Sequence, residues 1–209
     1  ILCGAAATKM RVRKGRVTSV VAGDRTVHPS EVVWTGTVHS LTSALGWEAP
    51  DLQYLALVCY NLMLTDGERF PFQWCYHGAA DVVFSRVSIP ANFDPSTTPP
   101  GRRSMCVEVT CREGDALYRD PTSRIEHVIH DMKRETLLQS DGEVLDVRCE
   151  PVPWAYPIYT LKYRDEIKAL EDRVATLDNV LQAGRLGLFW YNNMDHSIDA
   201  SLKMADELV

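Results

Sequence analysis

The sequence lacks the features that mark several large classes of protein. No apolar run approaches the roughly 18 residues of a membrane helix, since the best one, Tyr54 to Leu64, is interrupted by Asn61. Basic residues number 22 against 28 acidic ones, and the formal charge of −6 argues against a nucleic-acid surface. The apolar start, Ile1 to Ala7, has no basic region before it and is not a signal peptide. We therefore expect neither a membrane nor a nucleic-acid partner.

Local motifs for common chemistries are missing as well. No Gly-x-Gly-x-x-Gly follows a strand, and no Gly-x-Ser-x-Gly occurs. His127 and His130 are spaced to share a metal on a helix, but no carboxylate is placed with them as a third ligand. The six cysteines form no Cys-x-x-Cys and no zinc-like group with histidine: Cys3, Cys59, Cys75, Cys106, Cys111 and Cys149. We expect free thiols, a reducing cytoplasm and no metal site.

What is present indicates one large or two small globular domains, with 209 residues of which 45% are hydrophobic. Alternating apolar residues predict strands, and a few apolar stripes at helical spacing predict helices. The predicted strand segments are 11–21, 26–34, 54–64, 73–77, 82–88, 104–110, 144–152 and 179–183, with turns at Lys14-Gly15-Arg16 and Gly23-Asp24. The predicted helices are 37–45, about 120–132, 164–175 and the C-terminal segment. Antiparallel strands with helices grouped around them make an α+β fold.

Details of three elements can also be predicted. Pro121 suits the first turn of the helix that carries Ile125 and Met132, and Ser123 with Glu126 has the spacing of a capping box. Pro151 and Pro153 are expected to end the strand that begins at residue 144. Strands 73–77 and 82–88 flank Gly78-Ala79-Ala80, which predicts a hairpin with a three-residue loop.

That hairpin would give Arg86 a particular setting. An odd loop places Tyr76 opposite Val82, and Arg86 about 13 Å further along on the same face. Arg86 would share this face with Trp74, Tyr76 and Phe84 as the one fixed positive charge, which is costly unless it meets an anion or a carboxylate. A solvent-facing arginine at the end of a sheet is the plainer alternative.

The C-terminal segment combines a strand, a glycine turn and a helix start. Asn193 or Asp195 can cap the helix, whose first N–H groups then have no intrahelical partner and can face an anion or a flavin ring. Gly184-Arg185, Gly187, Tyr191 and the run Asn-Met-Asp-His-Ser to Ser197 resemble the flavin-contacting segment of UDP-galactopyranose mutases and protoporphyrinogen-oxidase-like relatives. The resemblance extends over about 52–208, most closely at 74–86, 153–160 and 184–197.

The resemblance implies both a cofactor and a set of contacts. FAD would be contacted by Gly184, Arg185, Asn193, Met194 and Asp195, with Arg185 approaching the diphosphate and the helix start approaching the flavin pyrimidine edge. A nucleotide-sugar or other small-molecule substrate would be bound by Tyr76, Arg86, Tyr156 and Tyr191. Without the resemblance, Tyr156 and Tyr191 would be interpreted as core tyrosines with local hydrogen bonds.

The same resemblance implies how the chain is divided. Residues 1–50 would be a remnant of an FAD-binding domain, 51–160 the substrate-binding sheet and 161–209 the flavin-contacting segment. The first βαβ unit of the flavin domain is not in the sequence, so we expect the C-terminal portion of a longer flavoprotein, which alone would not retain FAD. Phe189, Trp190 and Tyr191 would then be uncovered, and self-association into a homo-oligomer is expected.

Three interpretations remain open. The chain is the substrate-binding part of a mutase-like flavoenzyme, or part of a protoporphyrinogen-oxidase-like or amine-oxidase-like enzyme, or a stand-alone binding or assembly domain. Tyr76, Arg86, Tyr156 and Tyr191 favour the mutase, and the missing dinucleotide fingerprint favours a non-catalytic role.

Overall fold

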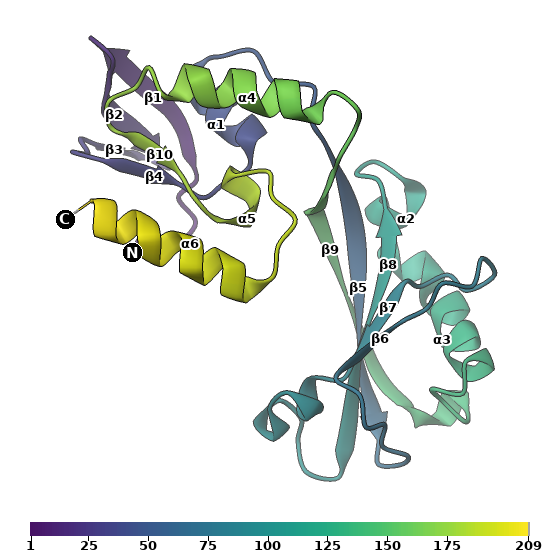
Figure 1. The fold of residues 1–209 in the computed structure, drawn as a ribbon. Coiled ribbons are helices and arrows are strands. Elements are labelled where there is room, and N and C mark those ends of the chain that lie inside the picture. Colours follow the sequence, from purple (N-terminus) through teal and green to yellow (C-terminus); the bar gives the residue numbers. More distant parts are fainter. Residues whose placement is uncertain (209) are drawn as a thin grey trace. The chain divides into compact units, whose positions relative to one another are not determined.

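The computed structural model describes residues 1–208 and divides into two compact units. One unit is Tyr54–Tyr156, and the other joins Ile1–Gln53 to the segment that begins at Pro157. The sheets are mainly antiparallel, with helices grouped beside them, so the predicted α+β class is confirmed (Figure 1). Within the part of the chain that the structure describes, no helix is long and apolar enough to span a membrane.

The unit Tyr54–Tyr156 is built on a five-stranded antiparallel sheet in the order β6-β7-β8-β5-β9. The strands are β5 (Gln53–Thr65), β6 (Trp74–Tyr76), β7 (Arg86–Ser88), β8 (Arg102–Cys111) and β9 (Val144–Ile158). Short helices connect them: η1 (Pro90–Asn92), η2 (Pro95–Thr97), α2 (Ala116–Arg119), η3 (Pro121–Arg124), α3 (Ile125–Arg134) and η4 (Asp141–Glu143). The predicted central strand, residues 54–64, corresponds to β5.

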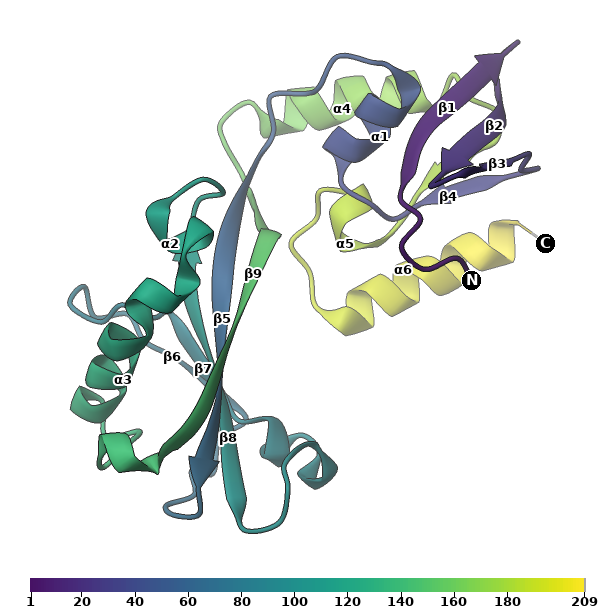
Figure 2. The same ribbon diagram turned by 180° about the vertical axis from the view of Figure 1, so that it is seen from behind.

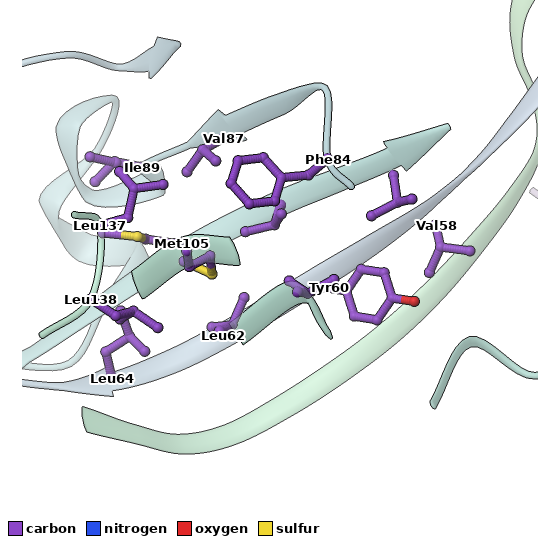
Figure 3. Close-up of a cluster of buried hydrophobic side chains, with 14 of the residues drawn as sticks. Val58, Tyr60, Leu62, Leu64, Phe84, Val87, Ile89, Met105, Leu137 and Leu138 are labelled. Atoms are coloured by element: carbon purple, nitrogen blue, oxygen red, sulfur yellow. The ribbon is translucent and has the colours of Figure 1, made fainter. Parts of the chain in front are cut away.

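One face of this sheet holds the hydrophobic core. Because side chains alternate along a strand, Val58, Tyr60 and Leu62 of β5 point to the same side, where they are almost completely buried. Figure 3 shows these side chains packed with Phe84 and Met105. Helix α3 covers this face through its own buried stripe, Val128 and Met132, in agreement with its predicted spacing.

The start of α3 differs from the prediction. Pro121 opens a separate 3₁₀ turn, η3, and the α-helix begins at Ile125. Ser123 does not form the expected capping box with Glu126; its hydroxyl instead donates to the carbonyl of Asp120 at 2.6 Å. A local side-chain bond of this kind competes with helix capping, and here it closes the turn before the helix.

Strand β9 also differs from the prediction, because it runs through Pro151 and Pro153 to Ile158. A proline has no N–H for the ladder, which normally ends a strand inside a sheet. β9 lies at the edge of the sheet with β5 as its only neighbour strand, and there a proline N can face away from the ladder.

The hairpin β6–β7 has a longer loop than predicted. Tyr76 pairs with Arg86, Cys75 with Val87 and Trp74 with Ser88, so residues 77–85 form the loop. The predicted pairing of Tyr76 with Val82 is therefore wrong. The prediction that Tyr76 and Arg86 share a face is nevertheless correct. The observed loop of residues 77–85, like the predicted one, has an odd number of residues, and directly paired residues point to the same face. Tyr76 and Arg86 are thus neighbours on adjacent strands.

The other unit contains two smaller sheets (Figure 2). β1 (Ala7–Arg13), β2 (Arg16–Ala22) and β3 (Arg25–Val27) form an antiparallel meander, while β4 (Val32–Trp34) and β10 (Val180–Gln182) pair in parallel. Its helices are α1 (Val38–Leu45), α4 (Tyr163–Val174), α5 (Gly184–Gly187) and α6 (Met194–Glu207). Asn179, which is 1% exposed, joins the sheets by accepting from Val17 N–H at 2.8 Å and donating to the carbonyls of Val17 and Ser30, each at 3.0 Å.

Candidate functional site

The face of the five-stranded sheet opposite the core carries the polar and aromatic residues that the sequence singles out. Trp74 and Tyr76 of β6, Arg86 of β7 and Glu108 of β8 alternate with core residues and therefore lie on this outer face. Tyr76 is 66% exposed and Trp74 is 49% exposed. We call this surface, from β6 to β9, the outer face.

Arg86 and Glu108 form an ion pair at the centre of the outer face. They are directly opposite in the β7–β8 ladder, and Nη2 of Arg86 donates to Oε1 of Glu108. The hydroxyl of Tyr156 donates to the second carboxylate oxygen, Oε2, at 3.1 Å. The Arg86 guanidinium also lies 6.0 Å from the centroid of the Tyr76 ring. Three of the four predicted substrate contacts, Tyr76, Arg86 and Tyr156, are therefore gathered around the Arg86–Glu108 ion pair.

Glu108 is the residue that sequence reasoning missed, and it changes the electrostatics of the site. The Glu108 side chain is 7% exposed and that of Arg86 is 30% exposed, so the carboxylate is largely covered while the cation is partly open. Although burial alone would lower the pKa of the Arg86 guanidinium, its hydrogen bond to Glu108 and the charge of that carboxylate raise it above its ordinary value. Arg86 is therefore not a lone charge among apolar neighbours.

Two further details of Arg86 matter. Its Nε is buried and has no hydrogen-bond partner among the described residues, so the guanidinium has donor capacity that Glu108 does not use. Phe84, which was expected beside Arg86, is 1% exposed and belongs to the core on the other side. The long loop explains this difference, because Phe84 lies within it and is not bound to the alternation of the strand.

Tyr191, the fourth predicted substrate contact, lies in the other unit. Its backbone N–H donates to the hydroxyl of Tyr159 at 2.7 Å, and the Arg185 guanidinium lies 4.6 Å from the centroid of its ring. Arg185 also donates through Nη1 to the carbonyl of Asn192. Arg185 thus folds over its own loop and holds the segment between α5 and α6 in shape.

The start of α6 agrees with the predicted position. Asn193 occupies the N-cap with extended backbone angles, but its side chain makes no capping bond, and Asp195 lies in the first turn. Met194 is 79% exposed. The first N–H groups of a helix lack intrahelical acceptors, so this end can face an electron-rich ring or an anion. Three of the expected FAD contacts, Asn193, Met194 and Asp195, therefore lie together at this helix start.

Two glycines shape the turn before α6. Gly184 has φ of +71°, a left-handed conformation that residues with a side chain rarely adopt. A Cβ on Gly187 would lie 2.5 Å from the carbonyl oxygen of Trp34, so only glycine allows α5 to approach the end of β4 this closely. The glycines of the predicted segment therefore have a structural reason that is independent of any cofactor.

Two cysteines also meet on the outer face. Cys59 of β5 is paired with Glu108, and Cys106 of β8 is two residues from Glu108 on the same side. A hydrogen bond between the two thiols, and secondarily burial, raises the pKa of Cys59, while the same bond lowers the pKa of Cys106. This pair could not be predicted from the sequence, because β-sheet pairing brings together residues that are far apart along the chain.

A third group lies on the core side of the hairpin. The Sγ of Cys75 is 3.2 Å from Nε2 of His77, and Nδ1 of His77 is 3.1 Å from Oε2 of Glu135. The order resembles a nucleophile, a base and an orienting carboxylate. However, burial raises the pKa of the Cys75 thiol against the opposing bond from the Val87 backbone, which disfavours the thiolate that such chemistry needs. We assign this group to packing between the hairpin and α3.

The two units, one built on a five-stranded antiparallel sheet and one containing a parallel strand pair, also occur in solved structures of larger proteins. Among solved structures, the chain is similar to reduced UDP-galactopyranose mutase, with a TM-score of 0.81 and 15% identity over 96% of this chain and 46% of that one. It is also similar, with a TM-score of 0.60 and 14% identity, to an oxidoreductase from Methanosarcina mazei, over 87% of this chain and 43% of that one. A protein from Exiguobacterium sp. 255-15, provisionally assigned as a protoporphyrinogen oxidase, gives the same TM-score and identity over 87% of this chain and 42% of that one.

These likenesses confirm the fold to which the resemblance points. The chain spans less than half the length of each solved structure. No protein-family model matches the sequence, and no curated protein matches it either. At 14–15% identity the comparison establishes the fold alone.

Proposed function

We propose that the outer face binds the diphosphate of a nucleotide-sugar, as part of a flavin-dependent enzyme of the UDP-galactopyranose mutase type. The observation that carries this proposal is the partly exposed Arg86, whose buried Nε has no partner among the described residues, in a fold similar to the mutase over 96% of the chain. A guanidinium presents several N–H donors in one plane, which matches the oxygens of a diphosphate.

In this proposal Glu108 and Tyr156 position the cation. Glu108 holds one edge of the guanidinium, and Tyr156 fixes the carboxylate from its other oxygen, so the remaining donors of Arg86 keep one orientation. Tyr76, on the neighbouring strand, adds an exposed ring beside the cation. Tyr156 would then act through Glu108 and not through a direct bond to phosphate.

The flavin would be held from this chain by Gly184, Arg185, Asn193, Met194 and Asp195. The start of α6 offers N–H groups, and the Arg185 loop offers a shaped backbone beside them. When bound and reduced, FAD supplies a nucleophile for the anomeric carbon of the sugar, with UDP as the leaving group. The residues of this chain would orient the diphosphate and keep negative charge favourable at the helix end.

Titration of the chain with UDP, followed by amide NMR, tests the proposal. Arg86→Lys keeps the charge but loses the planar fork, and we expect it to weaken binding by roughly ten- to a hundredfold, as does Arg86→Ala. Glu108→Gln keeps an acceptor that can hold the Arg86 guanidinium in place but removes the competing negative charge, and we expect tighter binding than in the wild type. Arg148→Lys is the matched control, since the Arg148 side chain is 86% exposed on β9.

Two results would contradict the proposal: unchanged UDP affinity in both Arg86 variants, or amide shifts that lie away from the outer face. The second candidate function is an oxidoreductase of the protoporphyrinogen-oxidase type, which the two structures with TM-scores of 0.60 support. It predicts no UDP binding. A non-catalytic binding or assembly domain would bind neither UDP nor, when combined with a flavin-binding domain, FAD.

A further inference from the structure

Two thiols and one carboxylate converge on the outer face from neighbouring strands. The sulfur atoms of Cys59 and Cys106 and a carboxylate oxygen of Glu108 all lie within 4.8 Å of one another. Both cysteines are half-buried, and Glu108 is almost completely buried. Among the side chains that the structure describes, no other group of three such ligand atoms lies this close together.

The sheet register decides what the two thiols can form. Cys59 is opposite Glu108, and Cys106 is opposite Asn61, so the two cysteines are diagonal neighbours. Diagonal neighbours in an antiparallel pair have Cα atoms about 7–8 Å apart, beyond the roughly 4.4–6.8 Å that a disulfide spans. A tetrahedral metal bound at about 2.3 Å holds two sulfurs about 3.8 Å apart, so small side-chain rotations suffice.

We propose that Cys59, Cys106 and Glu108 bind a zinc ion, with the fourth coordination position open to the outer face. Two thiolates and a carboxylate are ligands that Zn²⁺ accepts, and three protein ligands with an open position are typical of sites that exchange water. The charges also balance. Two thiolates and the carboxylate carry three negative charges, which Zn²⁺ and the neighbouring Arg86 neutralise.

In this site Arg86 becomes the outer partner of the ligating carboxylate. Its ion pair with Glu108 is already in place, and such partners orient metal ligands in many proteins. Binding would release the two thiol protons to solvent as Zn–S bonds form. The sequence predicts no metal site, because metal-binding motifs are recognised by ligands that are close together along the chain. These three ligands come from two strands, β5 and β8, that are far apart in the sequence.

Titration of the reduced chain with Co²⁺, and then with Zn²⁺ as competitor, tests the proposal. We expect one Co²⁺ per chain, a thiolate-to-cobalt charge-transfer band, and loss of that band as Zn²⁺ is added. Zn²⁺ should also protect two thiols from alkylation, as counted by mass spectrometry. Loss of a residue that only hydrogen-bonds a metal ligand typically lowers metal affinity ten- to a hundredfold. Cys59→Ser and Cys106→Ser each remove a ligand itself, so each should lower the affinity at least about a hundredfold.

Cys75→Ser and Cys149→Ser are the matched controls, since each removes a half-buried strand thiol elsewhere in the sheet. They should retain the band. Glu108→Gln should keep a thiolate band but bind Zn²⁺ at least roughly tenfold more weakly. The proposal would be overturned by the absence of a band in the wild type, or by a band that survives in both Cys59→Ser and Cys106→Ser. Circular dichroism of every variant excludes loss of fold as the cause.

Discussion

Arg86 shows what single residues contribute at the centre of this molecule. The face of the sheet on which Arg86 lies could be predicted from the sequence, because the alternation of side chains along a strand is a local property. Its partner could not, because Glu108 is on a different strand and looked like any exposed acidic residue. The requirement that a half-buried guanidinium meets an anion was correct, and the anion that it meets within the chain is Glu108.

A second buried ion pair permits a pH-dependent prediction. Burial raises the pKa of Glu143, but the backbone N–H groups of Gln139 and Ser140 and the guanidinium of Arg103 outweigh it, so the pKa lies below its ordinary value of 4.5. A lowered pKa in the folded state stabilises the protein above the ordinary value, and this stabilisation is lost as the pH falls through the folded value.

We therefore expect Glu143→Gln to lower the free energy of unfolding by about 2 kcal/mol at pH 7, and by less at pH 3. Urea unfolding at both pH values measures this difference. The exposed Glu113 serves as the control in a Glu113→Gln variant, which should change little at either pH. An equal loss at pH 7 and pH 3 would show that the Arg103 pair does not depend on the carboxylate charge.

At the scale of elements, the strongly periodic segments were predictable and the connections were not. β5 is a continuous apolar run, β8 has an alternating apolar pattern and α3 has an apolar stripe at helical spacing, and the structure confirms all three elements. The hairpin loop was mispredicted because Gly78 and its neighbours look like a tight turn, whereas residues 77–85 make a loop whose Phe84 enters the core. The packing of a large buried side chain here decides the register, and this information is not local.

Asp131 of α3 links this loop to the helix. It is 0% exposed, accepts from the backbone N–H of Val83 at 2.9 Å and accepts from Arg134 at 3.3 Å. Asp131→Ala would leave the half-buried Val83 N–H without its acceptor, and we expect a loss of about 3 kcal/mol in the free energy of unfolding. The amides of the loop should also exchange faster with deuterium.

Glu126→Ala on the same helix is the control, because Glu126 is exposed, and we expect a change within about 0.5 kcal/mol. If Asp131→Ala unfolds at the same urea concentration as this control, then the contact of α3 with the loop does not contribute to stability.

At the scale of the whole molecule, the chain presents one wall of the proposed flavin site. The segment from Gly184 to Asp195 supplies a helix end and a shaped loop, while adenosine contacts in dinucleotide sites come from a glycine-rich βαβ unit that the sequence does not contain. We expect the purified chain to carry no bound flavin, which its visible absorption spectrum measures. A stoichiometric flavin band would mean that the residues of this chain form a complete site.

Helix α6 carries an exposed apolar face, through which we expect copies of the chain to associate. Met194, Ile198 and Leu202 follow one face of the helix and are 79%, 54% and 63% exposed. Of the predicted aromatic run, Trp190 and Tyr191 are 37% and 50% exposed, whereas Phe189 is 2% exposed and packs edge-on against Tyr159 with ring centroids 6.1 Å apart. The predicted surface therefore loses Phe189, and the face of α6 is the larger apolar surface that we expect to associate.

Light scattering over a range of protein concentrations should show a mass that rises with concentration. Ile198→Lys with Leu202→Lys should keep the chain monomeric, and Lys203→Ala, on another side of the helix, should not. A strict monomer at high concentration in the wild type would show that this face does not associate.

The three prolines of β9 have a consequence for how the sheet meets other chains. Pro151, Pro153 and Pro157 are separated by even numbers of residues, so their nitrogens all point to the same side of the strand. That side must be the one away from β5, since a proline facing β5 would interrupt the ladder. The open edge therefore lacks three hydrogen-bond donors, and an extended peptide cannot pair along it. With β6 only three residues long at the opposite edge, the sheet is protected at both borders from fibril-like growth.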